Sequence, residues 1–345
     1  MAIANYSIPT KLTFYPSYLQ YAYATGLING VDYETENEIT DEDVYKLAIL
    51  DPSQTSSFDF SPEGFIAYDL KYDNWNFDFG MILGHNMNNA SIILRPSTYN
   101  IEGEELIPNE FINTTNIKNY QDNSSISYNG WSAFNLTDVP TDAKGIGLKC
   151  QNVGINPDLL TMGSFLFGKK WEAPQNIEMN SSVNYSYGFK QKKTIGGKTI
   201  SHMNYYKPNK WLLDAWELSS EQSDTRNEAT DSRNGIRTWK VSWNFLQDKY
   251  AMNQNNMQNS AGWDVDENSD YSIGADGTSL YNSSDGIDFY TSVIKVCMGG
   301  HLPCVVKISE SNNPDQFAIV RIKKYSVSQK SPKFVSVKLT LEEQV

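Results

Sequence analysis

The chain has 345 residues, of which 39% are hydrophobic and 20% are charged, so a folded protein with two domains is expected. Its 41 acidic and 28 basic side chains give a net charge of -13, which repels phosphate backbones and anionic lipid surfaces. The sequence has no uninterrupted apolar run of about 20 residues. We therefore expect no specific nucleic-acid partner and no membrane insertion.

Short strands separated by turn residues are expected in the first half of the chain. An acidic run over residues 32–43 is typical of a solvated loop. Residues 75–83 alternate with period 2, which predicts a strand with one aromatic face toward a core, ending at residues 84–86. Further strands, each bounded by Gly, Pro, Asn or Asp, are expected at 91–94, 131–136, 146–150 and 165–167. This density of strands predicts a β-sandwich over residues 1–172.

A polar stretch without an apolar period, residues 173–184, predicts a linker to a second domain over residues 185–345. A hairpin is expected at 189–200, because Gly196-Gly197 supplies the positive φ angles of a tight turn. Residues 239–245 form the clearest strand, with Trp, Val, Trp and Phe on one face.

A loop, a helix and three strands are expected in the rest of the second domain. Residues 248–285 are polar and far longer than an ordinary connection, so they predict an interaction loop. One helix is expected from a cap at Ser284 or Asp285 to Gly299-Gly300. Closing strands are expected at 302–308, 317–322 and 335–341. The whole chain is predicted to be mainly β.

The histidines and glycines form none of the familiar catalytic or cofactor motifs. His85, His202 and His301 lie in no nucleophile-elbow context, and no pair has the helical spacing of a zinc motif. His85 is interpreted as a turn histidine bound to neighbouring backbone. Gly145-Ile146-Gly147 lacks the rest of the dinucleotide fingerprint. We therefore predict no catalytic residue, no cofactor-binding residue and no metal-binding residue.

Two further features leave alternatives open. Residues 264–270 alternate oxygen ligands like the start of a calcium loop, but they lack its glycine and bidentate glutamate. A solvated loop is favoured, with weak Ca²⁺ binding as the alternative. The cysteines, Cys150, Cys297 and Cys304, are odd in number, so buried free thiols are favoured over a bridge between the last two.

Two stretches resemble virion proteins of tailed bacteriophages. Residues 75–86 and 90–94 are similar to the strand, Gly-His-Asn and next strand of discoidin-like or galactose-binding-like jelly rolls in phage tail and baseplate proteins. The same holds for the second half: residues 238–245, the helix ending at Gly299-Gly300, and residues 302–306, 317–320 and 335–341 resemble minor tail proteins of the tail-tip and distal-tail type. In this chain a cysteine replaces the aromatic that usually follows the proline.

The resemblance implies a galactose-binding-like sandwich in residues 1–172 and a tail-tube-like β-barrel or sandwich with one helix in residues 185–345. It implies a virion structural protein of the tail tip or baseplate that is not an enzyme. Such a protein assembles as a homo-oligomeric ring and contacts tube, hub or fibre proteins. It would be assembled in the host cytoplasm and located in the virion tail. Residues 1–9, which lack the features of a secretory signal, agree with this.

Two other functions are weighed from the residues themselves. A carbohydrate-binding adhesin or decoration protein would recognise host surface glycans through exposed aromatics such as Trp75 or Trp131. A tail-borne glycan hydrolase would need two carboxylates at a fixed spacing across one cleft, and 41 acidic residues make such pairs uninformative.

Overall fold

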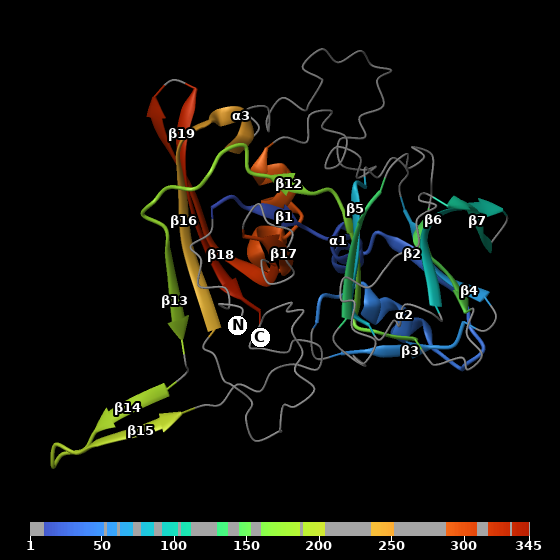
Figure 1. Ribbon diagram of the computed structural model, residues 1–345, viewed down its shortest axis with the longest axis horizontal. Helices are drawn as coiled ribbons and strands as arrows, with labels where there is room; N and C mark the ends of the chain where they lie inside the picture. Colours follow the sequence, from blue (N-terminus) through green and yellow to red (C-terminus); the bar gives the residue numbers. More distant parts are fainter. Residues whose placement is uncertain are drawn as a thin grey trace.

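The structure is a computed structural model, and the protein is mainly β with short helices, as predicted. The structure describes residues 10–51, 54–60, 63–71, 77–85, 92–102, 105–111, 130–136, 145–152, 160–186, 189–203, 236–251, 288–308, 317–331 and 333–344. Within these ranges, no helix has the length and apolar character needed to cross a membrane. Two β-rich halves lie side by side along the longest axis (Figure 1).

A seven-stranded antiparallel sheet forms the half on the left of Figure 1. Its strands, in spatial order, are β12 (Trp171–Glu172), β1 (Thr13–Tyr15), β17 (Cys304–Lys307), β18 (Phe317–Ser331), β19 (Phe334–Glu343), β16 (Ile236–Gln247) and β13 (Ser182–Ser186). Among the described residues the sheet is open, with β12 and β13 at its edges, and it does not close into the barrel form expected for this half.

The strand β16 shows how the sequence pattern builds the core of this sheet. Trp239, Val241 and Trp243 are buried on one face, as the alternation predicts. The expectation that Phe245 continues this face is wrong. A β-bulge between Trp243 and Leu246 shifts the register, so that Leu246 is buried while Phe245 has a φ of 59° and is 63% exposed.

A buried ion pair joins β16 to β19 near the end of both strands. Arg237 donates from its backbone nitrogen to Glu343 Oε2 at 2.7 Å and from Nε to Glu343 Oε1 at 2.6 Å. The side chains are 3% and 0% exposed. The Arg237 guanidinium also lies 4.9 Å from the centre of the Trp239 ring. Both charges therefore have partners inside the protein, which a buried charge requires.

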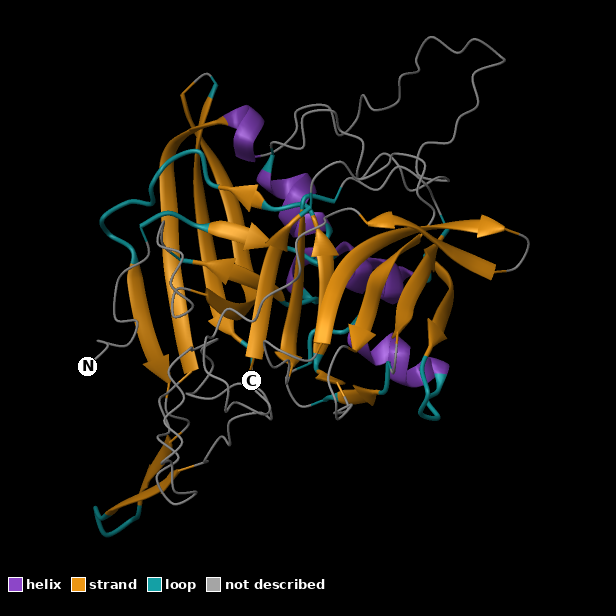
Figure 2. Cartoon of the chain, turned by 45° about the vertical axis from the view of Figure 1, so that its right-hand side comes forward, coloured by secondary structure: helices purple, strands orange, loops and turns teal. Residues whose placement is uncertain are grey.

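The other half is a sandwich of antiparallel sheets (Figure 2). A five-stranded sheet has the order β2 (Ile28–Glu34), β4 (Glu63–Leu70), β9 (Gly145–Asn152), β6 (Ile92–Glu102) and β7 (Glu105–Phe111). A three-stranded sheet consists of β11 (Ser164–Gly168), β5 (Phe79–His85) and β8 (Gly130–Asn135), and β10 (Leu160–Met162) pairs with β3 (Ser56–Phe58). The core between the sheets includes Ile66 and Tyr68 of β4 and Phe165 of β11.

Two helices that the sequence analysis does not predict close this core, and each is delimited by its caps. The helix α1 (Tyr18–Thr25) begins at Ser17, whose hydroxyl accepts from Gln20 N, and ends at Gly26 with a φ of 70°. The helix α2 (Asp41–Leu47) begins inside the acidic run 32–43, and β2 covers the start of that run. The solvated loop expected over the whole run is confined to residues 35–40, between β2 and α2.

The C-terminal helical segment is shorter than predicted. It consists of the π-helix η3 (Tyr290–Lys295) and the 3₁₀ turn η4 (Met298–Gly300), in which Gly299 and Gly300 have positive φ angles. The expected cap at Ser284 or Asp285 lies outside the described residues. One further short helix, α3 (Asp248–Ala251), follows β16.

One apolar cluster joins the two halves. Leu50, the β5 residues Phe79, Met81 and Leu83, and Leu166 of β11 pack with Val305, Phe317 and Ile319 of the seven-stranded sheet. The ring of Tyr15 on β1 bridges them, at 5.1 Å from Phe79 and 5.9 Å from Phe317 between ring centres. We call this cluster the shared core.

The shared core explains why β5 differs from its prediction. All seven residues of β5 are buried, because Ile82 faces the core of the first half while Phe79, Met81 and Leu83 face the second. The strand is thus buried on both faces, whereas the alternation predicts one buried face. The domain limits at 172 and 185 stay a prediction, but β1, from the start of the chain, pairs with β17 near its end.

Two adjacent substitutions on β5 test whether the shared core couples the halves. Ile82→Ala and Leu83→Ala each remove a fully buried side chain, so each is expected to cost about 2–5 kcal/mol. Leu83→Ala should also split the calorimetric transition into two, because it removes contacts between the halves, and Ile82→Ala should lower a single transition. Equal behaviour of the two variants would contradict the coupling.

Candidate functional site

The histidines lie on three separate elements. His85 ends β5 and is fully buried, and burial lowers its pKa to about 3, so it is neutral at physiological pH. It therefore ends a buried strand and does not lie in a turn, while its hydrogen bond with backbone agrees with the prediction. His202 lies exposed on β15 (Thr199–Met203), and His301 lies exposed after η4. Within the described ranges, no group of three or more His, Cys, Asp or Glu side chains has an arrangement that could hold a metal ion.

The cysteines of the second half are free and buried, as predicted. The hydrogen bond with Cys297, together with burial, raises the pKa of the Cys304 thiol well above its usual range. Cys304 therefore stays protonated and unreactive at neutral pH. Cys150 lies in β9, and its side chain is outside the described residues.

The glycines, tryptophans and calcium-like stretch that the sequence analysis names are described by the structure only in part. Gly145, Ile146 and Gly147 lie in the middle strand β9, where a Cβ on Gly147 would collide with the Ile66 carbonyl oxygen, so this glycine serves strand packing. Trp75 and the calcium-like stretch 264–270 lie outside the described residues, and Trp131 lies in β8 with its side chain outside them. The adhesin hypothesis therefore stays an expectation.

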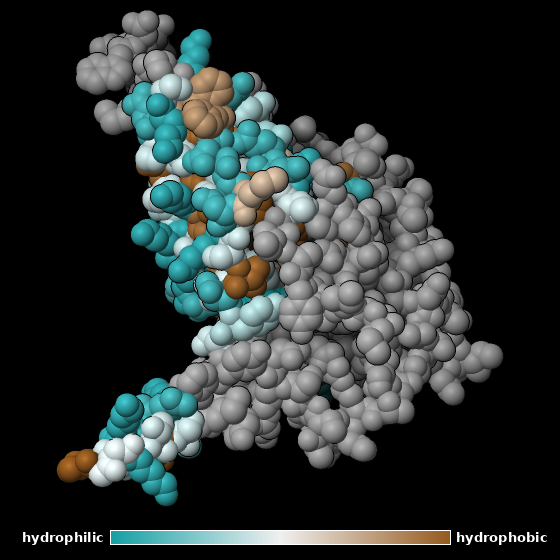
Figure 3. All heavy atoms as spheres, turned by 60° about the vertical axis from the view of Figure 1, so that its left-hand side comes forward, coloured by the Kyte–Doolittle hydropathy of each residue, from teal (hydrophilic) through white to brown (hydrophobic). Residues whose placement is uncertain are grey.

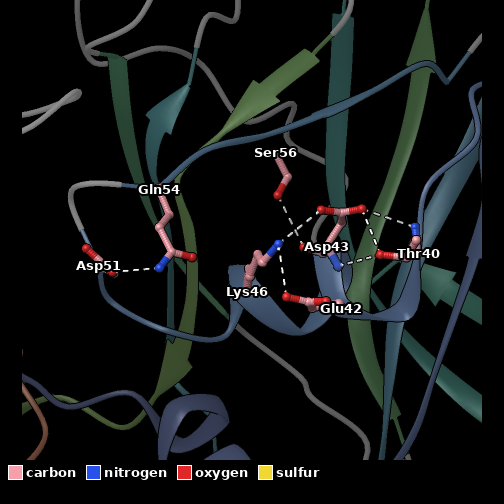
Figure 4. Close-up of polar contacts among 7 residues, drawn as sticks. All are labelled: Thr40, Glu42, Asp43, Lys46, Asp51, Gln54 and Ser56. Atoms are coloured by element: carbon pink, nitrogen blue, oxygen red, sulfur yellow. Dashed lines mark hydrogen bonds and ion pairs between the residues drawn. The ribbon is translucent and has the colours of Figure 1, made fainter.

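Polar contacts shape the start of α2, as Figure 4 shows. The Thr40 hydroxyl accepts from Asp43 N at 3.3 Å, and Asp43 Oδ2 accepts from Thr40 N at 3.2 Å, which makes a capping box. Lys46 Nζ lies 3.3 Å from Glu42 Oε1 and 3.5 Å from Asp43 Oδ1. The Ser56 hydroxyl donates to the Asp43 carbonyl, which ties the helix to β3.

An acidic surface results from this arrangement. Its members are the exposed carboxylates of β2, the following loop and the first turn of α2, namely Glu34, Glu36, Glu38, Asp41 and Glu42. Lys46 is the one basic residue in the segment 28–47. The half-buried side chains of Tyr33 and Ile39 lie in the same segment, so apolar atoms accompany the charges.

A basic hairpin stands at the other end of the molecule. The strand β14 (Phe189–Lys193) pairs with β15, as the sequence predicts. The turn is closed by Thr194, whose backbone nitrogen donates to the Lys198 carbonyl at 2.8 Å, and by Gly197 with a φ of 80°. Every residue from 190 to 202 is exposed, and Ile195 at the tip is 110% exposed. Figure 3 shows the hairpin projecting from the body with hydrophobic atoms at its end.

The two charged features differ from a catalytic site in their geometry. Both present side chains to solvent on protruding or edge elements, and they lie at opposite ends of the longest axis in Figure 1. Such surfaces suit contact with another macromolecule, because several exposed groups can be covered at once.

The capping box predicts a measurable, pH-dependent contribution to stability. Thr40→Ala should lower the free energy of unfolding by about 0.5–2 kcal/mol at pH 7, whereas Thr40→Ser should retain most of it. The Thr40 hydroxyl holds the pKa of Asp43 below its usual range. The stabilisation is therefore present above the usual Asp range and is lost as the pH falls through the native pKa of Asp43.

Urea unfolding of the three proteins at pH 7 and at pH 3 measures this effect. The gap between wild type and Thr40→Ala should narrow at the lower pH. A gap that is the same at both pH values would contradict the role of the Asp43 carboxylate.

Comparison with known proteins gives little similarity. No family model matches the chain, and no curated protein matches it. Among solved structures, the chain is similar to one described as CpGH89CBM32-6 produced by Clostridium perfringens, with 12% identity, over 41% of this chain and 94% of that one. The TM-score of 0.26 is too low to carry an argument about fold or function.

Proposed function

We propose that this chain is a non-enzymatic structural protein of a bacteriophage virion, located at the tail tip or baseplate. It acts by assembling into a homo-oligomeric ring and by contacting tube, hub or fibre proteins. The resemblance of residues 75–86, 90–94, 238–245, 288–306, 317–320 and 335–341 to phage tail proteins supports the class of particle, and the mainly β fold is compatible with it.

The basic hairpin is the observation that carries the assembly role. An isolated two-stranded hairpin is marginally stable in water, and this one has no buried residue from 190 to 202. Its projecting position, with an exposed isoleucine at the tip, is suited to packing on another chain.

The open sheet and the shared core support the same role. The edge strand β13 pairs with β16 on one side, and among the described strands none pairs with its other side. Such an edge can pair with a strand of another subunit. The shared core holds the two halves against each other, so the acidic surface and the seven-stranded sheet keep a fixed relative geometry. A ring needs this constancy, because each subunit must repeat the same rotation.

The proposal predicts a closed oligomer and a place in the particle. Sedimentation velocity of the purified chain should show a species of several subunits at micromolar concentration, and negative-stain microscopy should show annular particles. Mass spectrometry of virions from a phage that encodes the chain should detect it, and antibody-gold labelling should place it at the tail end.

A control separates this function from the adhesin hypothesis. A glycan array probed with the chain should stay silent while the ring forms. A stable monomer that is absent from purified virions would contradict the proposal, and strong binding to one glycan class by a monomer would favour the adhesin.

A further inference from the structure

The charge of the chain is unevenly distributed. The hairpin, residues 189–203, contains four lysines and no acidic residue. Since it contributes +4 to a total of -13, the remaining residues carry a net charge of -17. A basic projection is therefore set against a strongly acidic body, which favours contact between the hairpin of one copy and the body of another.

One face of the hairpin concentrates the features of a contact surface. The register pairs Lys190 with His202 and Lys192 with Ile200, and these four side chains share one face because side chains alternate along a strand. We call it the basic face. Ile200 in its middle is 55% exposed. Within residues 190–202 the opposite face carries Gln191, Lys193, Thr199 and Ser201, which are polar and include a single charge.

The acidic surface has the complementary composition. It offers five exposed carboxylates around half-buried apolar side chains, whereas the basic face offers lysines around an exposed isoleucine. Contact between the two surfaces would place ammonium groups against carboxylates and would bury apolar atoms between them. Electrostatic attraction and apolar burial would then both favour the interface. Lys46 contacts Glu42, whereas Glu34 lies on β2 and Glu36 and Glu38 lie in the loop beyond it.

The positions of the two surfaces decide which copy each meets. The hairpin projects beside the seven-stranded sheet, and β2 and α2 lie in the other half of the molecule in both ribbon views (Figures 1 and 2). A chain therefore cannot place its hairpin on its own acidic surface. A contact between two different patches on successive copies is head-to-tail, and repetition of such a contact closes into a ring or extends as a filament.

We propose that the basic face of the hairpin docks on the acidic surface of a second copy of this chain. This inference rests on the ring assembly of the proposed function and adds the contact that makes it. Duplex nucleic acid would also attract lysines, but the body that carries the hairpin has a net charge of -17 and would repel it. A second copy of this chain fits the hairpin better, because its acidic body attracts the lysines.

Two neighbouring lysines provide a matched test. Lys192→Glu and Lys193→Glu make the same charge change on opposite faces of the hairpin, and both positions are exposed. Lys192→Glu should raise the dissociation constant of the oligomer about tenfold or more, and Lys193→Glu should change it by about twofold or less. Raising the salt from 50 to 500 mM should weaken wild-type association in the same direction. Sedimentation velocity measures the dissociation constant of each variant and of the wild type at each salt concentration, and circular dichroism checks that the variants keep the fold.

A charge exchange identifies the partner surface. A hairpin variant (Lys190→Glu, Lys192→Glu and Lys198→Glu) and an acidic-surface variant (Glu36→Lys, Glu38→Lys and Glu42→Lys) should each stay monomeric alone. Mixed in equal amounts they should associate, because each then presents a surface that complements the other. Association of the mixture is the expected result, and it would not arise if the two surfaces met different partners.

The outcomes separate this contact from the proposed function. If the wild type forms the ring and the hairpin variant does so equally well, the hairpin contact is overturned and the ring stands. If the wild type is monomeric at every concentration, both are overturned. If the hairpin variant loses binding to a fluorescent DNA duplex and keeps its self-association, the hairpin serves nucleic acid and the inference is wrong.

Discussion

The shared core is the constraint on which the rest of the structure depends. It places side chains of β5 and β11 against β17 and β18, with β1 and Tyr15 between them. Apolar surface on both sides is removed from water only when the halves meet, so the hydrophobic effect favours their contact and the packing of these side chains fixes their orientation. The acidic surface therefore keeps a fixed position relative to the seven-stranded sheet.

Local patterns predicted those elements whose environment the sequence itself encodes. The alternation in β16 and the Gly196-Gly197 turn needed no tertiary information, and both are confirmed. Phe245 was misplaced because a bulge shifts the register within the strand, and alternation alone does not show where the partner strand gains or loses a residue. The burial of β5 on both faces depends on a contact between segments far apart in the chain.

The candidate surfaces were only partly predictable. The acidic run is visible in the sequence, but its division into β2 and α2 is not. The helix α2 depends on a capping box and on the packing of Val44 and Leu47. The sequence signal for the capping box is Thr40 followed three residues later by Asp43. The lysines of the hairpin are equally visible in the sequence. Their exposure depends on the hairpin being separate from the seven-stranded sheet, which ends at β13. The sequence could not show that these two opposite charges lie at opposite ends of one body, since that follows from the assembled halves.

The ion pair between Arg237 and Glu343 has a consequence for how the large sheet forms. These residues face each other across β16 and β19, and both are buried. A register slip of one residue between β16 and β19 would turn the Glu343 side chain to the opposite face of the sheet. The Arg237 guanidinium would then be buried without its carboxylate partner, at a cost of several kcal/mol. The same slip would move Val241 and Leu339 away from the core face, so the hydrophobic pattern favours the same register. The ion pair thus disfavours misaligned registers between β16 and the C-terminal strand β19.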